Sequence, residues 1–192
     1  MQSDARAHIL ETMRELTIRG GALPSMDAVA KAAGVSKGGL THHFPNRTAL
    51  LGALVEMVGI RTTETFERAR TSAPVSRAYL ETSVPDSGEL DDFFVLFTCY
   101  QALRAAGIDG HPSFDAFVVD LTRALTAEFG DPFQALIVRL VGDGLLLNSV
   151  MGTPVPAEER DALIEHFSRA AAGPSTSSTD TSTSSISTES TS

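Results

Sequence analysis

The sequence predicts an all-α protein, and three features of its 192 residues support this fold class. Apolar residues recur three and four positions apart through most of the chain, which is the spacing of one helix face. Prolines and several glycines separate these periodic stretches, as helix ends require. No stretch alternates apolar and polar residues in the way a half-buried strand does. We therefore expect helices joined by short loops.

The first predicted helix runs from Ala5 to Arg19 and ends at the pair Gly20-Gly21. Ile9, Met13 and Leu16 recur at helical spacing and would form its buried face. Acidic and basic residues are mixed with the apolar ones here, so this stretch lacks the composition of a secretory signal peptide.

Residues 26–47, MDAVAKAAGVSKGGLTHHFPNR, predict two short helices separated by a tight corner. Gly34 can take the left-handed conformation that such a corner needs, and the Ser36 hydroxyl can cap the second helix. Leu40 and Phe44 give that second helix an inward face. This arrangement is typical of a helix-turn-helix, in which the second helix lies in the major groove of DNA.

The run AGVSKGGLTHHFPNRTALL resembles the N-terminal domain of the TetR family of transcriptional regulators. The resemblance extends over about residues 5–57 and departs at Thr41, where the family usually has a tyrosine that contacts a phosphate. It implies a DNA-binding domain over residues 1–46 and a double-stranded DNA operator as partner.

The exposed positions of the second short helix and the resemblance together predict the DNA contacts. Lys37, at the start of that helix, is placed to reach guanine acceptors, and Arg47 lies where the family has a basic phosphate contact. The helix N-terminus at Ser25 offers backbone amides to a phosphate. The predicted set is Ser25, Met26, Ser36, Lys37, Gly38, Gly39, Thr41, His42, His43 and Arg47.

Two features of this helix allow alternative explanations. Gly38 and Gly39 each lower helix propensity by about 1 kcal/mol relative to alanine. They either let the backbone approach the groove floor or simply relax a short helix. His42 and His43 point about 100° apart with no third ligand near in sequence, so we expect hydrogen bonds to phosphate and no metal site.

The net charge of −9 is concentrated outside the predicted DNA-binding part. Residues 1–60 contain six Lys and Arg against five Asp and Glu, whereas residues 61–192 contain nine against nineteen. The acidic remainder would stay away from phosphates. A net charge of +1 on the first part predicts modest, salt-sensitive non-specific affinity for DNA.

The rest of the chain predicts six further helices. They cover residues 46–72, 75–82, 90–106, 113–129, 131–151 and 157–172. We expect these helices to form a second domain over residues 47–172, with residues 47–72 as the connecting helix. Residues 173–192 are rich in serine and threonine with almost nothing to bury, which predicts a disordered tail.

Aromatic residues gather in this second part of the chain. At helical spacing such residues usually form core, which is the simpler explanation. The TetR resemblance instead implies a pocket for an apolar or aromatic small-molecule effector. The predicted lining is Phe66, Phe93, Phe94, Phe97, Tyr100, Gln101, Phe114 and Phe117.

The last two predicted helices have more apolar surface than one chain would cover. Packing on their own domain is one explanation, and the resemblance implies a homodimer built from two helices of each subunit. The predicted interface is Ile137, Leu140, Val141, Gly144, Leu147, Asn148, Leu163, Ile164 and Phe167.

The remaining features argue against other classes of protein. No nucleophile with its base, carboxylate pair or phosphate-binding loop is recognisable, so we expect neither an enzyme nor a cofactor. The sequence contains no run of about 18 consecutive apolar residues, so we expect no membrane span. The single cysteine, Cys99, excludes an internal disulfide. We expect a cytoplasmic, ligand-responsive repressor. The alternatives are a helical small-molecule binding protein with a vestigial DNA-binding unit, and a regulator controlled by a protein partner.

Overall fold

The computed structural model describes residues 2–171, and these residues form nine α-helices and no strand. The predicted all-α fold class is therefore confirmed. The helices are α1 Gln2–Gly20, α2 Met26–Ala32, α3 Lys37–His43, α4 Arg47–Ala69, α5 Val75–Thr82, α6 Ser87–Ala105, α7 Pro112–Phe129, α8 Pro132–Val150 and α9 Ala157–Ala171. The predicted serine- and threonine-rich tail, residues 173–192, lies outside the described residues.

The predicted helix boundaries need three corrections. Helix α1 begins at Gln2, three residues before the predicted Ala5. Helix α6 begins three residues before the predicted Leu90, because Asp86 caps it and accepts hydrogen bonds from the amides of Gly88 and Glu89, both at 2.9 Å. The Glu89 carboxylate in turn accepts a hydrogen bond from the Asp86 amide, which completes a capping box. Helix α4 ends at Ala69 rather than at Ser72.

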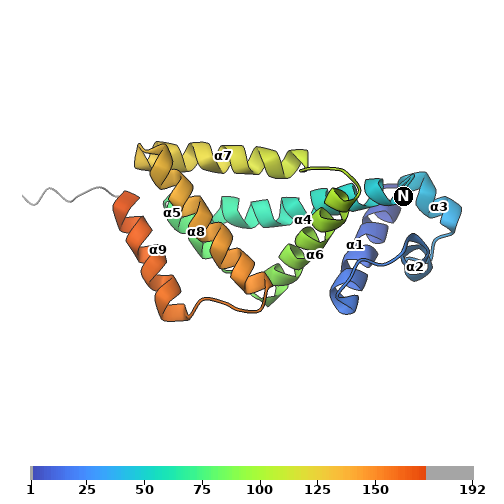
Figure 1. Cartoon of the computed structure of the whole chain (residues 1–192). Coiled ribbons are helices and arrows are strands. Elements are labelled where there is room, and N and C mark those ends of the chain that lie inside the picture. The colour runs from blue at the N-terminus through green and yellow to red at the C-terminus, as the bar shows by residue number, and fades with distance from the viewer. Residues whose placement is uncertain (1, 172–192) are drawn as a thin grey trace, which may run out of the picture.

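Helices α1 to α3 form a three-helix unit at one end of the molecule (Figure 1). Ile9, Val29, Leu40 and Phe44 are buried together in its core. The turn between α2 and α3 depends on Gly34, which has a φ of +67°, a conformation that side chains other than glycine rarely adopt. The predicted corner is thus observed.

Helix α4 joins the three-helix unit to the other helices and runs through the middle of Figure 1. Its first half, with Leu50 and Leu54, packs in the core of the three-helix unit, whereas Phe66 near its end packs in a second core. That second core is completed by α5, α7, α8 and α9. Helix α6 lies against both α1 and α4. A movement of α4 or α6 would therefore alter packing contacts both in the three-helix unit and among the remaining helices.

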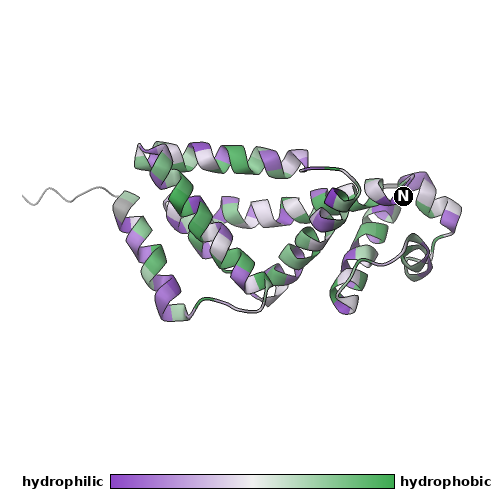
Figure 2. Cartoon of the chain, viewed as in Figure 1, coloured by the Kyte–Doolittle hydropathy of each residue, from purple (hydrophilic) through white to green (hydrophobic). Residues whose placement is uncertain are grey.

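Helix α8 is the one helix within residues 2–171 that is long and apolar enough, by length and composition alone, to cross a membrane. Figure 2 shows its largely apolar surface. This composition arises because both sides of the helix are apolar. Val138 and Leu145 face the second core, while Leu140 and Met151 are exposed on the other side. A single helix of this kind is weak evidence for a membrane span.

Candidate functional site

The predicted DNA-contacting helix, α3, is anchored by one face and presents the other to solvent. Leu40 and the capping residue Phe44 are buried, while Lys37, Thr41 and His42 are exposed. The Ser36 hydroxyl oxygen accepts a hydrogen bond from the Gly39 amide at 3.0 Å, as the sequence predicts for an N-cap. The arrangement leaves one polar face of a capped helix exposed to solvent.

Two predicted contact residues of α3 already have intramolecular partners. Lys37 Nζ lies 3.2 Å from Oδ1 of Asp27 on α2, and both side chains are largely exposed. The Thr41 hydroxyl donates to the carbonyl oxygens of Lys37 and Gly38 at 3.0 and 3.2 Å. Its proton is therefore used within the helix, and Thr41 offers only acceptor lone pairs to a partner, which suits a phosphate poorly.

The two glycines of α3 have different surroundings. A Cβ atom on Gly39 would lie 3.3 Å from the Ser36 hydroxyl oxygen, so a side chain there would crowd the capping hydrogen bond. A Cβ on Gly38 would lie 3.9 Å from the same oxygen, which is an ordinary contact. The capping hydrogen bond therefore favours glycine at position 39. At position 38 no close contact requires glycine, and the missing side chain leaves the exposed face of α3 without bulk there.

The other predicted contacts surround the start of α2 and α4. The Arg47 guanidinium donates to the carbonyl oxygen of Pro24 at 2.6 Å, which ties the beginning of α4 to the loop before α2. Ser25 caps α2 by accepting from the Ala28 amide at 3.2 Å. The Met26 side chain packs against the core, so only its backbone amide is available to a phosphate. His43 is half-buried beside Phe44.

A cavity of about 330 Å³ lies among helices α4 to α8, within the range of small-molecule sites. Six of the eight predicted lining residues border it, namely Phe66, Phe93, Phe97, Tyr100, Phe114 and Phe117. Phe94 and Gln101 do not, and this part of the prediction is corrected. The α6 residues of the wall are Glu89, Asp92, Phe93, Leu96, Phe97 and Tyr100, one face of that helix, and Phe94 and Gln101 lie on the opposite face.

The aromatic rings give the cavity a buried base and an open mouth. Phe66 is buried and meets Phe117 edge-to-face, with ring centroids 5.6 Å apart. Phe97 and Phe114 are about half exposed, and Phe114 lies 5.4 Å from the ring of Tyr100. Burial raises the pKa of the Tyr100 hydroxyl to about 12, with the nearby Asp115 carboxylate adding to the effect. Tyr100 is therefore a neutral hydrogen-bonding group at physiological pH.

One polar cluster lies at the α8 wall of the cavity. The Tyr79 hydroxyl donates to Asp143 at 2.6 Å, and Arg139 lies 3.0 Å from the other oxygen of the same carboxylate. Burial raises the pKa of Tyr79, and its hydrogen bond to Asp143 raises it further. Gly142 makes room for the tyrosine, because a Cβ there would lie 2.8 Å from Cζ of Tyr79.

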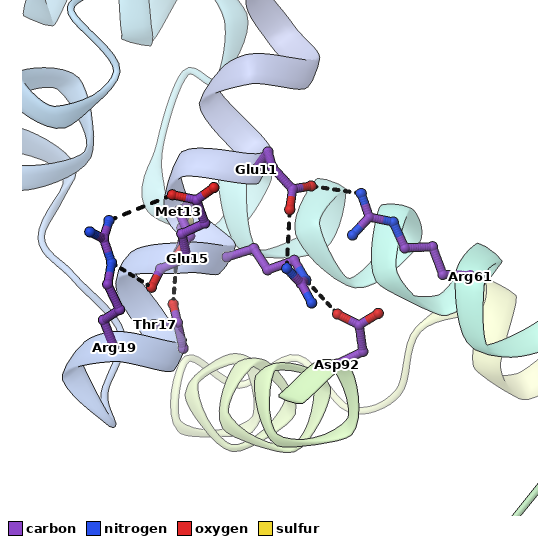
Figure 3. A network of polar contacts seen from close by, with 8 residues as sticks. Glu11, Met13, Glu15, Thr17, Arg19, Arg61 and Asp92 are labelled. Atoms are coloured by element: carbon purple, nitrogen blue, oxygen red, sulfur yellow. Dashed lines mark hydrogen bonds and ion pairs between the residues drawn. The ribbon is translucent and has the colours of Figure 1, made fainter. Parts of the chain in front are cut away.

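A second polar cluster connects the cavity to α1 (Figure 3). Arg61 on α4 pairs with Glu11 at 2.6 Å, Glu11 pairs with Arg14 at 3.1 Å, and the Arg14 Nε donates to Asp92 on α6. Burial by itself would raise the pKa of Glu11, but the hydrogen bonds and charges of Arg61 and Arg14 together outweigh it, and the pKa is lowered. The sequence analysis did not predict this cluster, because its α1 and α6 members are far apart in the chain, Arg14 and Asp92 by 78 positions.

An apolar stripe along α8, which we define as Phe133, Ile137, Leu140, Gly144, Leu147 and the capping residue Met151, is partly uncovered: Ile137 is half-buried against the second core, and Leu147 also borders the cavity. These positions alternate spacings of four and three residues, as along the contact line of paired helices. Leu140 and Met151 are exposed, and Gly144 has no neighbouring atom that would meet a Cβ. Four of these residues were predicted as interface residues, whereas Phe133 and Met151 were missed although the spacing indicates them.

The predicted contribution of α9 is corrected in part. Ile164 and Phe167 are buried in their own chain, within the core that includes α5, and are not available to a second subunit. Leu163 and Val141 are half-buried at the edge of this core, and Asn148 is exposed. The apolar side of α9 is thus covered, and α8 supplies the uncovered apolar surface.

Comparisons with known proteins agree with this geometry. Residues 9–54 match the family described as "Bacterial regulatory proteins, tetR family", and residues 73–172 match the family described as "Tetracyclin repressor-like, C-terminal domain". The second match alone spans more than half of the chain.

The chain belongs to the TetR family.

The solved structures include a similar protein, assigned as a TetR-family transcriptional regulator from Rhodococcus sp.. It is 20% identical, the alignment covers 88% of this chain and 98% of that one, and the TM-score is 0.64, which shows the same fold. A search of curated proteins finds no matching relative. As a TetR-family member the protein is a DNA-binding transcriptional regulator and not an enzyme.

Proposed function

We propose that this TetR-family protein is a cytoplasmic repressor that binds a near-palindromic operator as a homodimer and is released by a small lipophilic effector. Its DNA-binding domain would comprise residues 1–46, and residues 47–172 would form the effector and dimerisation domain. The observation that carries the proposal is the combination of an exposed, capped α3 with an aromatic cavity behind the helix that joins the two halves.

The homodimer would form through the α8 stripe. Exposed apolar side chains at this spacing, including Leu140 and Leu147, suit packing against the same helix of a second copy. A two-fold dimer would present its two α3 helices about 34–36 Å apart, one turn of DNA. The operator should therefore consist of two half-sites related by inverted symmetry.

The effector would act by favouring a conformation with a different separation of the two α3 helices. A ligand can do so only through its differential affinity for the two conformations. A coupling of about 1–3 kcal/mol would weaken operator binding roughly 5- to 150-fold. The cavity supports an effector of drug-like size with an apolar or aromatic body, since most of its wall is hydrocarbon.

The test is to select operators from random-sequence DNA with the full chain and then to titrate variants by fluorescence anisotropy. We expect a near-palindrome with half-sites one turn apart. Lys37→Ala should relax base preference at one or two positions of each half-site. Arg47→Ala should weaken all sequences alike and reduce the salt slope. An enriched sequence without inverted symmetry, or the reverse pattern in the two variants, would contradict the proposal.

Two contacts favour a second candidate, a helical small-molecule binding protein whose DNA-binding unit is weak. Asp27 neutralises Lys37 in the free protein, and the Thr41 hydroxyl is bonded within its own helix. If no sequence is enriched in the selection while aromatic compounds bind the cavity in calorimetry, this candidate replaces the repressor.

A further inference from the structure

Four charged residues of alternating sign connect the cavity wall to α1 and back. They are Arg61 on α4, Glu11 and Arg14 on α1, and Asp92 on α6, in that order of contact, and Figure 3 labels Arg61, Glu11 and Asp92. The two outer members, Arg61 and Asp92, line the cavity. The two inner members lie on α1, which belongs to the DNA-binding domain. The wall of the cavity therefore holds α1 through two ion pairs.

Asp92 is the least exposed carboxylate of this cluster. Its side chain is 12% exposed and that of Arg14 is 17% exposed, so each strongly favours keeping an opposite charge beside it. Arg14 Nε donates to Oδ1 of Asp92, and within residues 2–171 the other oxygen, Oδ2, accepts no hydrogen bond. Asp92 thus faces the cavity with one oxygen already bonded and one still able to accept a bond.

Of the other charged groups in the cavity wall, Arg139, Asp143 and Arg61 are in ion pairs, whereas Glu89 is hydrogen-bonded and has no cationic partner within residues 2–171. Arg139 forms an ion pair with Asp143, and Arg61 forms one with Glu11. Glu89 accepts the Asp86 amide in the capping box of α6. Asp92 is therefore the cavity carboxylate whose cation, Arg14, comes from the DNA-binding domain.

We propose that Asp92 exchanges partners between Arg14 and a cationic nitrogen of the effector, and that this exchange loosens α1 and weakens operator binding. The inference rests on the effector role proposed above and names the chemistry of that effector. It is a lipophilic amine that is protonated at neutral pH, with its apolar body among Phe93, Phe97 and Phe117.

Loosening α1 would reach the DNA-binding surface because α1 is part of that domain's core. Ile9 and Met13 of α1 are completely buried beside Val29 of α2 and Leu54 of α4. Helix α1 also lies against α6, where the pair of Arg14 and Asp92 spans the two helices. A cation that pairs with Asp92 would break this ion pair between α1 and α6.

The experiment uses the full-length protein, its selected operator and three probes that share one apolar body. The probes are 3,3-diphenylpropylamine, 3,3-diphenylpropan-1-ol and 3,3-diphenylpropanoic acid. Calorimetry should show the amine binding about tenfold or more tighter than the alcohol, the usual worth of a charge-assisted hydrogen bond, with the acid weakest. The amine should also weaken operator binding about 5- to 150-fold in anisotropy titrations.

Two variants test the exchange itself. Asp92→Asn should remove the preference for the amine over the alcohol. Arg14→Met removes the competitor and leaves the carboxylate, so the amine should bind more tightly than to the wild type but no longer change operator affinity. Arg19→Met is the matched control on the same helix, since its exposed partner Glu15 is not part of the cavity wall. This control should respond as the wild type does.

The outcomes separate this inference from the proposed function. Equal binding and equal operator release by amine and alcohol would leave the effector role standing and overturn the role of Asp92. Unchanged amine affinity in Arg14→Met would overturn it as well. If none of the three probes binds the wild-type protein, the cavity is not a site for such molecules, and the proposed effector role fails together with this inference.

Discussion

Replacing Leu140 by glutamate tests the proposed dimer most directly. Leu140 lies in the middle of the α8 stripe and is 55% exposed in the single chain. Complete burial of a leucine side chain is worth about 2 kcal/mol, so covering the exposed half contributes about 1 kcal/mol per subunit. Two-fold symmetry makes this about 2 kcal/mol per dimer, a factor of about thirty in the dissociation constant. The buried carboxylate would add to the loss.

The assay is sedimentation equilibrium over a range of protein concentrations, with operator titration in parallel. Leu140→Glu should dissociate at least thirtyfold more readily, by the estimate above, and lose operator affinity with it. Val119→Glu is the matched control, because Val119 is an equally exposed apolar residue, 57% exposed, on α7 outside the stripe. An intact Leu140→Glu dimer, or equal dissociation of the control, would refute the assignment of the stripe.

Three further predictions follow from single contacts. Asp27→Asn should raise non-specific DNA affinity and steepen its salt dependence in anisotropy titrations, because Lys37 loses its intramolecular counter-charge. Gly142→Ala should lower the free energy of unfolding by about 1–3 kcal/mol in urea, because the added methyl group collides with Tyr79. Cys99 should not react with a thiol reagent at pH 8 until the protein unfolds, since burial raises its pKa to about 12 and leaves almost no thiolate.

Each of these predictions has a control or a contrary result. Asp120→Asn on α7 removes an equal charge far along the chain from α3 and should leave the salt dependence unchanged. Gly52→Ala meets no atom within 4 Å and should be neutral or stabilising, so equal destabilisation would discount the collision at Gly142. Rapid labelling of native Cys99 would show that α6 opens far more readily than its burial suggests.

Local features of the fold were predictable because the groups that interact are close in sequence. Ser25, Ser36 and Asn46 each cap the helix that follows, at most three residues away. Gly34 takes the left-handed conformation expected of it. The early start of α6 was not predicted although its signal is also local, since Asp86 and Glu89 have the three-residue spacing of a capping box.

The aromatic character of the cavity was predictable from the sequence, but its full set of lining residues and their polar partners was not. Its aromatic composition is visible in the sequence, and the helical phase of α6 separates Phe93 and Phe97, which line it, from Phe94, which does not. This helical phase was sufficient to exclude Phe94 from the predicted lining, because the lining positions of α6 repeat every three to four residues. The pairing of Asp92 with Arg14 had no comparable signal, since the two residues are 78 positions apart.

The sequence by itself determined the helices, the corner at Gly34 and the family, because caps, turns and apolar spacing involve residues within one or two helical turns of each other. Only the tertiary structure decided which apolar faces are covered. Leu140 and Phe167 are both apolar residues at helical spacing, yet one is exposed and the other is buried against α5. Which face is covered depends on where distant helices pack, and hydrophobic burial is not directional, so no local pattern of side chains specifies it.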